Sequence, residues 1–114
     1  MAFLCINAKK EVLLRRRPNS GLFAGMMEIP GTSWTDCLPN SLQIGASQPT
    51  KTTWSDIQGT VVHVFTHFKL EIKVVRADIK KSIKINGLSW HPLETIDKAG
   101  LPSLMLKIIK HGLE

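Results

Sequence analysis

Residues 63–68, His-Val-Phe-Thr-His-Phe, gather side chains that could bind a ligand. Across residues 60–74 the even positions are mostly apolar and the odd positions mostly polar, which is the period of an extended strand. The apolar even positions are expected to face the core. Phe65 and Thr66 invert this pattern, with an aromatic ring in the polar phase and a hydroxyl where the core is expected. A hydroxyl both donates and accepts hydrogen bonds, whereas an aromatic ring can stack or wedge. The inversion therefore has two interpretations. One is a recognition site, and the other is a bulge or a tight hairpin connection that exposes the Phe65 ring; the pattern alone favours the second.

The cysteines and histidines do not form a metal-binding pattern. Cys5 and Cys37 lie 32 positions apart, without a Cys-x-x-Cys pair or clustered histidines. We therefore predict neither a zinc site nor an iron–sulfur cluster within this chain. Two thiols suit a reducing compartment, and each is expected to behave as a small buried hydrophobic residue.

Three consecutive arginines, Arg15, Arg16 and Arg17, are candidates for contacts to a polyanion. The chain has 114 residues and a net charge of +6, which makes a nucleic acid partner plausible. Because neighbouring residues of a strand point to opposite faces, at most two of these arginines share a surface. Pairing with acidic residues is the alternative. Glu28 has no second carboxylate nearby, so we expect a structural hydrogen bond rather than catalysis.

The elements that must position these residues belong to one domain of mixed strands and helices. Two short strands open the chain, an irregular stretch at 32–59 holds at most one weak helix, and an amphipathic helix closes it. The expected strands lie at 2–7, 11–17, within 60–74, and up to Trp90 after a turn at Asn86-Gly87, and the expected helices at about 35–45, at 93–98 and from 101. The apolar stripe of the last helix comprises Leu101, Leu104, Met105, Ile108 and Ile109. The three tryptophans, Trp34, Trp54 and Trp90, are expected in the core or in a lid.

Three blocks of the sequence resemble the Nudix-like C-terminal domain of the MutY family of adenine DNA glycosylases. They are "LLRRRPNSGLFAGMMEIPG" at 13–31, "HVFTHFKL" at 63–70 and "WHPLETIDKAGLPSLMLKII" at 90–109. Their order and their coverage of nearly the whole chain make the resemblance specific. It implies an α/β fold, a Nudix-like α/β/α sandwich with a mixed sheet, formed by residues 1–112. The last two residues, 113–114, resemble a cloning scar.

A working Nudix hydrolase also shares the first block, but its catalytic motif is missing. Such an enzyme holds divalent cations with several carboxylates at fixed spacing after the Pro-Gly turn. Counting from Gly31 places other residues at the motif positions, namely Cys37, Gly45, Ala46, Pro49 and Thr50. Between Gly31 and Lys69 the sequence has only Asp36 and Asp56 as carboxylates. We therefore predict that the chain does not hydrolyse nucleoside diphosphates.

The resemblance implies that the parent enzyme removes adenine mispaired with 8-oxoguanine, while this domain recognises the oxidised base in double-stranded DNA. Phe65, Thr66 and His67 match the family's recognition loop, with threonine at its serine position. His63 and the three arginines are candidate DNA contacts. The family's catalytic residues and iron–sulfur cluster belong to an N-terminal helical domain that is absent from this chain, so we expect no catalytic residue, metal or cofactor here and expect that domain as a partner.

A catalytically inactive Nudix-fold module for protein interactions is the alternative function. No run approaches the ~18 apolar residues of a membrane-spanning helix, and no signal peptide is apparent. We therefore expect a cytoplasmic, nucleoid-associated bacterial protein without a membrane partner.

Overall fold

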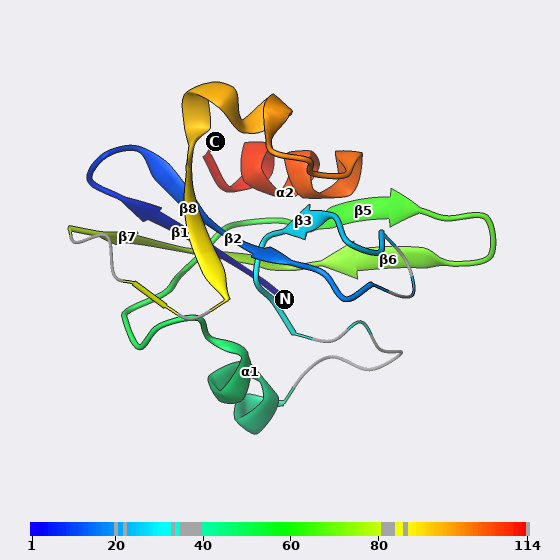
Figure 1. Cartoon of the computed structure of the whole chain (residues 1–114). Helices are drawn as coiled ribbons and strands as arrows, with labels where there is room; N and C mark the ends of the chain where they lie inside the picture. The colour runs from blue at the N-terminus through cyan, green and yellow to red at the C-terminus, as the bar shows by residue number, and fades with distance from the viewer. Residues whose placement is uncertain are drawn as a thin grey trace.

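The computed structural model describes residues 1–19, 21, 23–32, 34, 40–80, 84–85 and 87–113. Its main sheet has the strand order β3-β2-β1-β7-β4, with β8 also paired to β2. The strands are β1 (Ala2–Asn7), β2 (Glu11–Arg16), β3 (Met27–Glu28), β4 (Ser55–Asp56), β7 (Val74–Ile79) and β8 (Leu88–Pro92). Strands β1 and β7 pair in parallel, while the other neighbours are antiparallel. The predicted mixed sheet is therefore confirmed (Figure 1).

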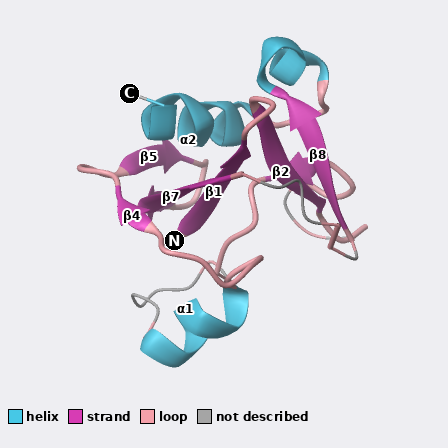
Figure 2. Ribbon diagram, turned by 90° about the vertical axis from the view of Figure 1, so that its left-hand side faces the viewer, coloured by secondary structure: helices cyan, strands magenta, loops and turns pink. Residues whose placement is uncertain are grey.

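Two α-helices and one 3-10 helix accompany the described part of this sheet. Helix α2 (Ser103–Leu113) covers one face, and η1 (Leu93–Lys98) follows β8 directly. Helix α1 (Ser41–Ser47) lies on the opposite side of the sheet from α2 (Figures 1 and 2) and buries none of its residues. The Asn40 side chain accepts a hydrogen bond from the Gln43 backbone N–H, which caps α1 at its start. This helix begins later than the predicted 35–45, and Cys37 and Asn86 lie outside the described residues.

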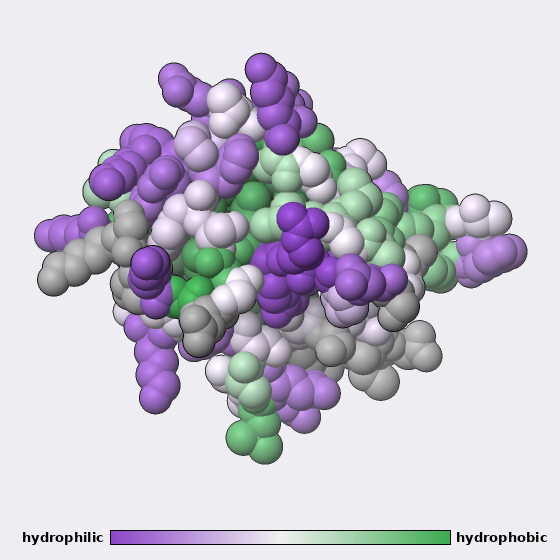
Figure 3. Space-filling view, in the orientation of Figure 1, coloured by the Kyte–Doolittle hydropathy of each residue, from purple (hydrophilic) through white to green (hydrophobic). Residues whose placement is uncertain are grey.

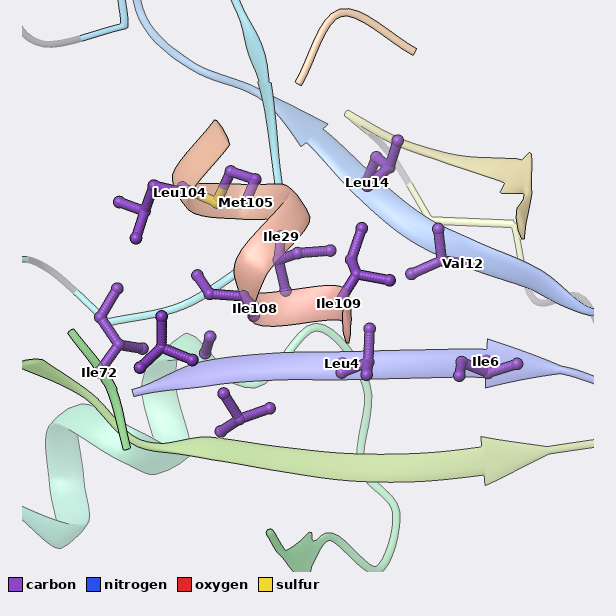
Figure 4. Packing of buried hydrophobic residues seen from close by; sticks show 13 residues of the cluster. Leu4, Ile6, Val12, Leu14, Ile29, Ile72, Leu104, Met105, Ile108 and Ile109 are labelled. Carbon is purple, nitrogen blue, oxygen red and sulfur yellow. The ribbon is translucent and has the colours of Figure 1, made fainter. Parts of the chain in front are cut away.

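The core lies between α2 and the main sheet. The predicted stripe of α2 packs onto alternate residues of β1 and β2 (Figure 4). Leu101 precedes the helix and is partly buried against the same cluster. The other four residues of the stripe are almost fully buried: Leu104, Met105, Ile108 and Ile109. The predicted amphipathic helix is thus confirmed. Burial of its apolar face stabilises the sheet, including β2, which carries Arg15 and Arg16.

Strands β5 (Val61–Val64) and β6 (Lys69–Ile72) form a separate two-stranded sheet. They pair antiparallel, with Val61 opposite Ile72 and Val64 opposite Lys69. Figure 1 shows this hairpin extending beyond the main sheet at one end of the molecule. The predicted interruption near residues 65 and 66 is therefore the hairpin connection.

The prediction that the apolar even positions between residues 60 and 74 face the core is wrong for β5. Val61 is 6% exposed, whereas Val62 and Val64 are 44% and 72% exposed. Cross-strand partners share a face, so the odd positions of β5 lie on the same side as the even positions of β6. Phe65 therefore belongs to the inner face, and its ring is half-buried rather than exposed as the pattern suggested.

Candidate functional site

The hairpin tip consists of Thr66 and His67, and both are exposed. The Phe65 backbone N–H donates to the carbonyl oxygen of Phe68 at 2.8 Å, which closes the chain around these two residues. Both side chains and the intervening backbone are thus available to a ligand. In Figure 3 polar atoms lie at the extremity of this end of the molecule, beside the green atoms of apolar residues.

An aromatic cluster supports the hairpin tip from the inner side. Phe65 stacks on Phe68 with ring centroids 4.5 Å apart and also contacts Phe23 at 5.8 Å. Trp34 lies 6.4 Å from the rings of Phe65 and Phe23. Such pairs add to the stability gained from burial alone. The sequence predicted Trp34 in the core or in a lid, and no sequence pattern connected Trp34 or Phe23 with the hairpin tip.

The signals that could have identified these supporting rings are weak. Phe23 has φ 55°, a left-handed conformation that a bulky residue adopts only where its surroundings impose it. Phe68 would have followed from the hairpin geometry, because it is the cross-strand neighbour of Phe65 beyond the last paired residues of β5 and β6.

The arginine run divides as strand alternation predicts. Arg15 and Arg17 share the carboxylate of Glu28, which accepts from Arg15 Nε at 2.9 Å and from Arg17 Nη1 at 2.7 Å. Glu28 is 5% exposed, so the expected structural role for this carboxylate is confirmed. Arg16 is exposed and donates to the carbonyl oxygen of Gly25 at 2.6 Å. The arginines therefore do not form one surface.

Arg17 also contacts an aromatic ring. Its guanidinium carbon lies 4.4 Å from the ring centroid of Trp34, within the range of a cation–π interaction. A cavity of about 790 Å³ is lined in part by Arg15, Arg17, Glu28 and Trp34. The hairpin tip does not line it, so the cavity and the tip are separate features.

His63 lies in β5, opposite Leu70 and near the tip of the hairpin, and faces helix α2. The ammonium of Lys107 donates to His63 Nδ1 at 3.1 Å, and the imidazole packs edge-on against Phe65 at 4.8 Å. A neutral imidazole with Nδ1 as acceptor carries its proton on Nε2. Lys107 was not among the predicted site residues, because only the tertiary structure brings α2 beside the hairpin. The pair adds positive charge next to the tip.

The described residues contain no group of three or more His, Cys, Asp or Glu side chains that could hold a metal ion. Of the positions that a Nudix hydrolase fills with catalytic residues, Gly45 and Ala46 lie exposed on α1, and Cys37 lies outside the described residues. Cys5 is fully buried, and a four-cysteine cluster does not fit a sequence with two cysteines. No helix in the described ranges is long and apolar enough to span a membrane.

Several known proteins resemble this chain. The human and rat adenine DNA glycosylases are 31% and 33% identical to it over 111 and 110 residues. These matches cover 88% and 87% of this chain but 20% and 21% of the relatives, so the chain spans about a fifth of their length. The sequence resemblance to adenine DNA glycosylases is thereby confirmed.

Solved structures share the fold. The C-terminal domain of mouse MUTYH, solved in complex with human PCNA, matches with a TM-score of 0.75 and 20% identity, over 96% of this chain and 83% of that chain. A MutT protein from Methanosarcina mazei Go1 matches with a TM-score of 0.70 and 22% identity, over 96% and 88%. The family model of the NUDIX domain matches residues 1–111. This chain therefore belongs to the NUDIX domain family.

Proposed function

We propose that the chain is the 8-oxoguanine-recognition domain of an adenine DNA glycosylase that removes adenine opposite the oxidised base. Cleavage of the glycosidic bond is assigned to a catalytic domain outside this chain. The sequence relatives support the repair role, and the absence of hydrolase carboxylates at the counted positions supports a binding role. The observation that carries the proposal is the exposed Thr66-His67 tip on a hairpin held by packed aromatic rings.

The chemistry of the tip suits the oxidised base. In 8-oxoguanine N7 carries a hydrogen and C8 carries a carbonyl oxygen, so a reader must accept at one atom and donate at its neighbour. The hydroxyl of Thr66 and a backbone N–H of the exposed tip together offer both functions. His67 can bind a phosphate, and Lys107 beside His63 adds positive charge for the DNA backbone. Phe65 supports the tip from within in this proposal.

The test replaces the Thr66 hydroxyl in the full-length glycosylase that contains this chain. Single-turnover adenine excision is compared on duplexes with adenine opposite 8-oxoguanine and opposite guanine. Thr66→Val keeps the shape but removes the hydroxyl, so we expect the preference for 8-oxoguanine to fall about twofold to tenfold. Thr66→Ser keeps the hydroxyl and should retain the preference. An unchanged preference in the valine variant would refute the role of the hydroxyl.

A protein-interaction module is the second candidate, because β5 exposes apolar side chains. Val62 and Val64 are 44% and 72% exposed, and the mouse MUTYH domain was solved in complex with human PCNA. Titration of the chain with human PCNA tests this function. If the chain is a protein-interaction module of this kind, it should bind PCNA measurably, Val64→Asp should weaken the binding, and Thr66→Val should leave it unchanged. Absence of binding to PCNA counts against this candidate.

A further inference from the structure

We infer that Arg17 is a positioning residue that holds the recognition hairpin through Trp34 and Phe65, and that it does not contact a DNA phosphate. Its consequence for base recognition rests on the proposed function. The inference about the hairpin itself stands on contacts within the chain. The sequence made Arg17 a candidate DNA contact, whereas this inference gives it a role within the fold.

The carboxylate of Glu28 fixes one side of the Arg17 guanidinium. Glu28 lies opposite Arg15 in the β2–β3 pairing, and the Arg17 backbone N–H continues this ladder to the Met26 carbonyl oxygen at 2.9 Å. The carboxylate and the Arg17 side chain are 7% and 17% exposed. Because removing one partner of a buried ion pair is costly, the guanidinium is held in place rather than free to follow a ligand.

The same guanidinium lies over Trp34, which carries the contact towards the hairpin. The guanidinium carbon is 4.4 Å from the Trp34 ring centroid, and the Trp34 ring is 6.4 Å from that of Phe65. A planar guanidinium can bind a carboxylate and stack on an aromatic face at the same time, which a lysine ammonium does poorly. Arg17 thus links the main sheet to the hairpin sheet.

Phe65 passes this support to the tip. Its ring stacks on Phe68 at 4.5 Å, and its backbone N–H bonds to Phe68 across the two-residue tip at 2.8 Å. Phe23 completes the support from a left-handed backbone conformation. Strained conformations of this kind persist only where the surrounding contacts impose them. A loss of packing at Trp34 should therefore loosen the bond that closes the tip.

Residue-resolved hydrogen exchange of the chain tests the positioning role without DNA. Arg17→Lys keeps the charge but loses the planar stack on Trp34. We expect the protection of the Phe65 amide to fall about threefold to tenfold, while protection of the Leu4 amide in β1 stays unchanged. Arg16→Lys is the matched control, because Arg16 is exposed and donates a hydrogen bond to the Gly25 carbonyl oxygen.

Two exchange results would overturn the positioning role. One is unchanged protection of the Phe65 amide in Arg17→Lys. The other is an equal fall at Phe65 and Leu4, because it would mean general destabilisation of the domain.

A second arm uses the full-length protein and separates positioning from phosphate contact. Loss of one phosphate contact lowers the slope of log affinity against log salt by about 0.9. For Arg17→Met we expect an unchanged slope and a reduced preference for 8-oxoguanine. A slope whose magnitude falls by about 0.9, the change expected for one lost phosphate contact, would overturn the inference. A wild-type protein without any preference for 8-oxoguanine would refute the proposed function instead, and the exchange experiment would still decide the positioning role.

Discussion

Replacing Phe65 by alanine distinguishes a structural ring from an exposed wedge. Phe65 is half-buried and contacts four rings, those of Phe23, Trp34, His63 and Phe68. Truncating a fully buried phenylalanine costs about 3–5 kcal/mol, and the cost at Phe65 should lie below that range because this residue is only partly buried. We therefore expect Phe65→Ala to lower the free energy of unfolding of the DNA-free chain by about 2 kcal/mol. A ring exposed in the absence of DNA would change it by less than about 0.5 kcal/mol.

Urea denaturation measures this difference, followed by tryptophan fluorescence and by far-ultraviolet circular dichroism. The fluorescence includes Trp34, which packs against Phe65, whereas circular dichroism reports on the whole fold. Val64→Ala is the matched control, because the neighbouring Val64 side chain is 72% exposed and its truncation should have little effect. If Phe65→Ala and Val64→Ala are equally stable, the aromatic cluster does not support the hairpin and our reasoning fails.

Two further predictions concern the core. A Cβ at Gly112 would overlap Leu4 Cδ2, so Gly112→Ala should lower the free energy of unfolding by about 1 kcal/mol despite alanine's better helix propensity. In urea titrations Gly112→Ala should cost less in a Leu4→Val background than in the wild type, and an equal cost in both would contradict the close approach. Burial, and secondarily the Asp78 carboxylate, raises the pKa of the Cys5 thiol from 9.0 to about 11. Since folding disfavours the thiolate, the free energy of unfolding should fall as pH rises from about 9 to about 11. Comparison with Cys5→Ala isolates this effect, and the same decline in both proteins would contradict it.

Local sequence patterns predicted most elements because the physical cause of each is local. The spacing of apolar residues in the last helix follows from 3.6 residues per turn, and four residues of that stripe are buried against the sheet. Strand alternation likewise predicted that at most two arginines share a face, and Arg15 and Arg17 both bind Glu28. The sequence also indicated that Glu28 is structural, since it has no acidic neighbour with which to hold a metal.

The face assignment of the hairpin failed because it depends on how the chain reverses. A tip of two residues places Phe65 and Phe68 on the same face, so the inner positions change from odd in β5 to even in β6. A single pattern of alternating faces across residues 60–74 assigns the same parity to both strands, so it cannot describe this change. The exposed ring expected at Phe65 is instead a half-buried one.

The sequence by itself determined the family resemblance, the amphipathic helix and the recognition tip as a candidate, because motifs and periodicity are properties of neighbouring residues. The tertiary structure alone decided which groups support that tip. Trp34 and Phe65 are 31 positions apart, and His63 and Lys107 are 44 apart, yet each pair is in contact. Such contacts arise when the hairpin folds back beside α2 and the segment after β3, and no local period encodes them.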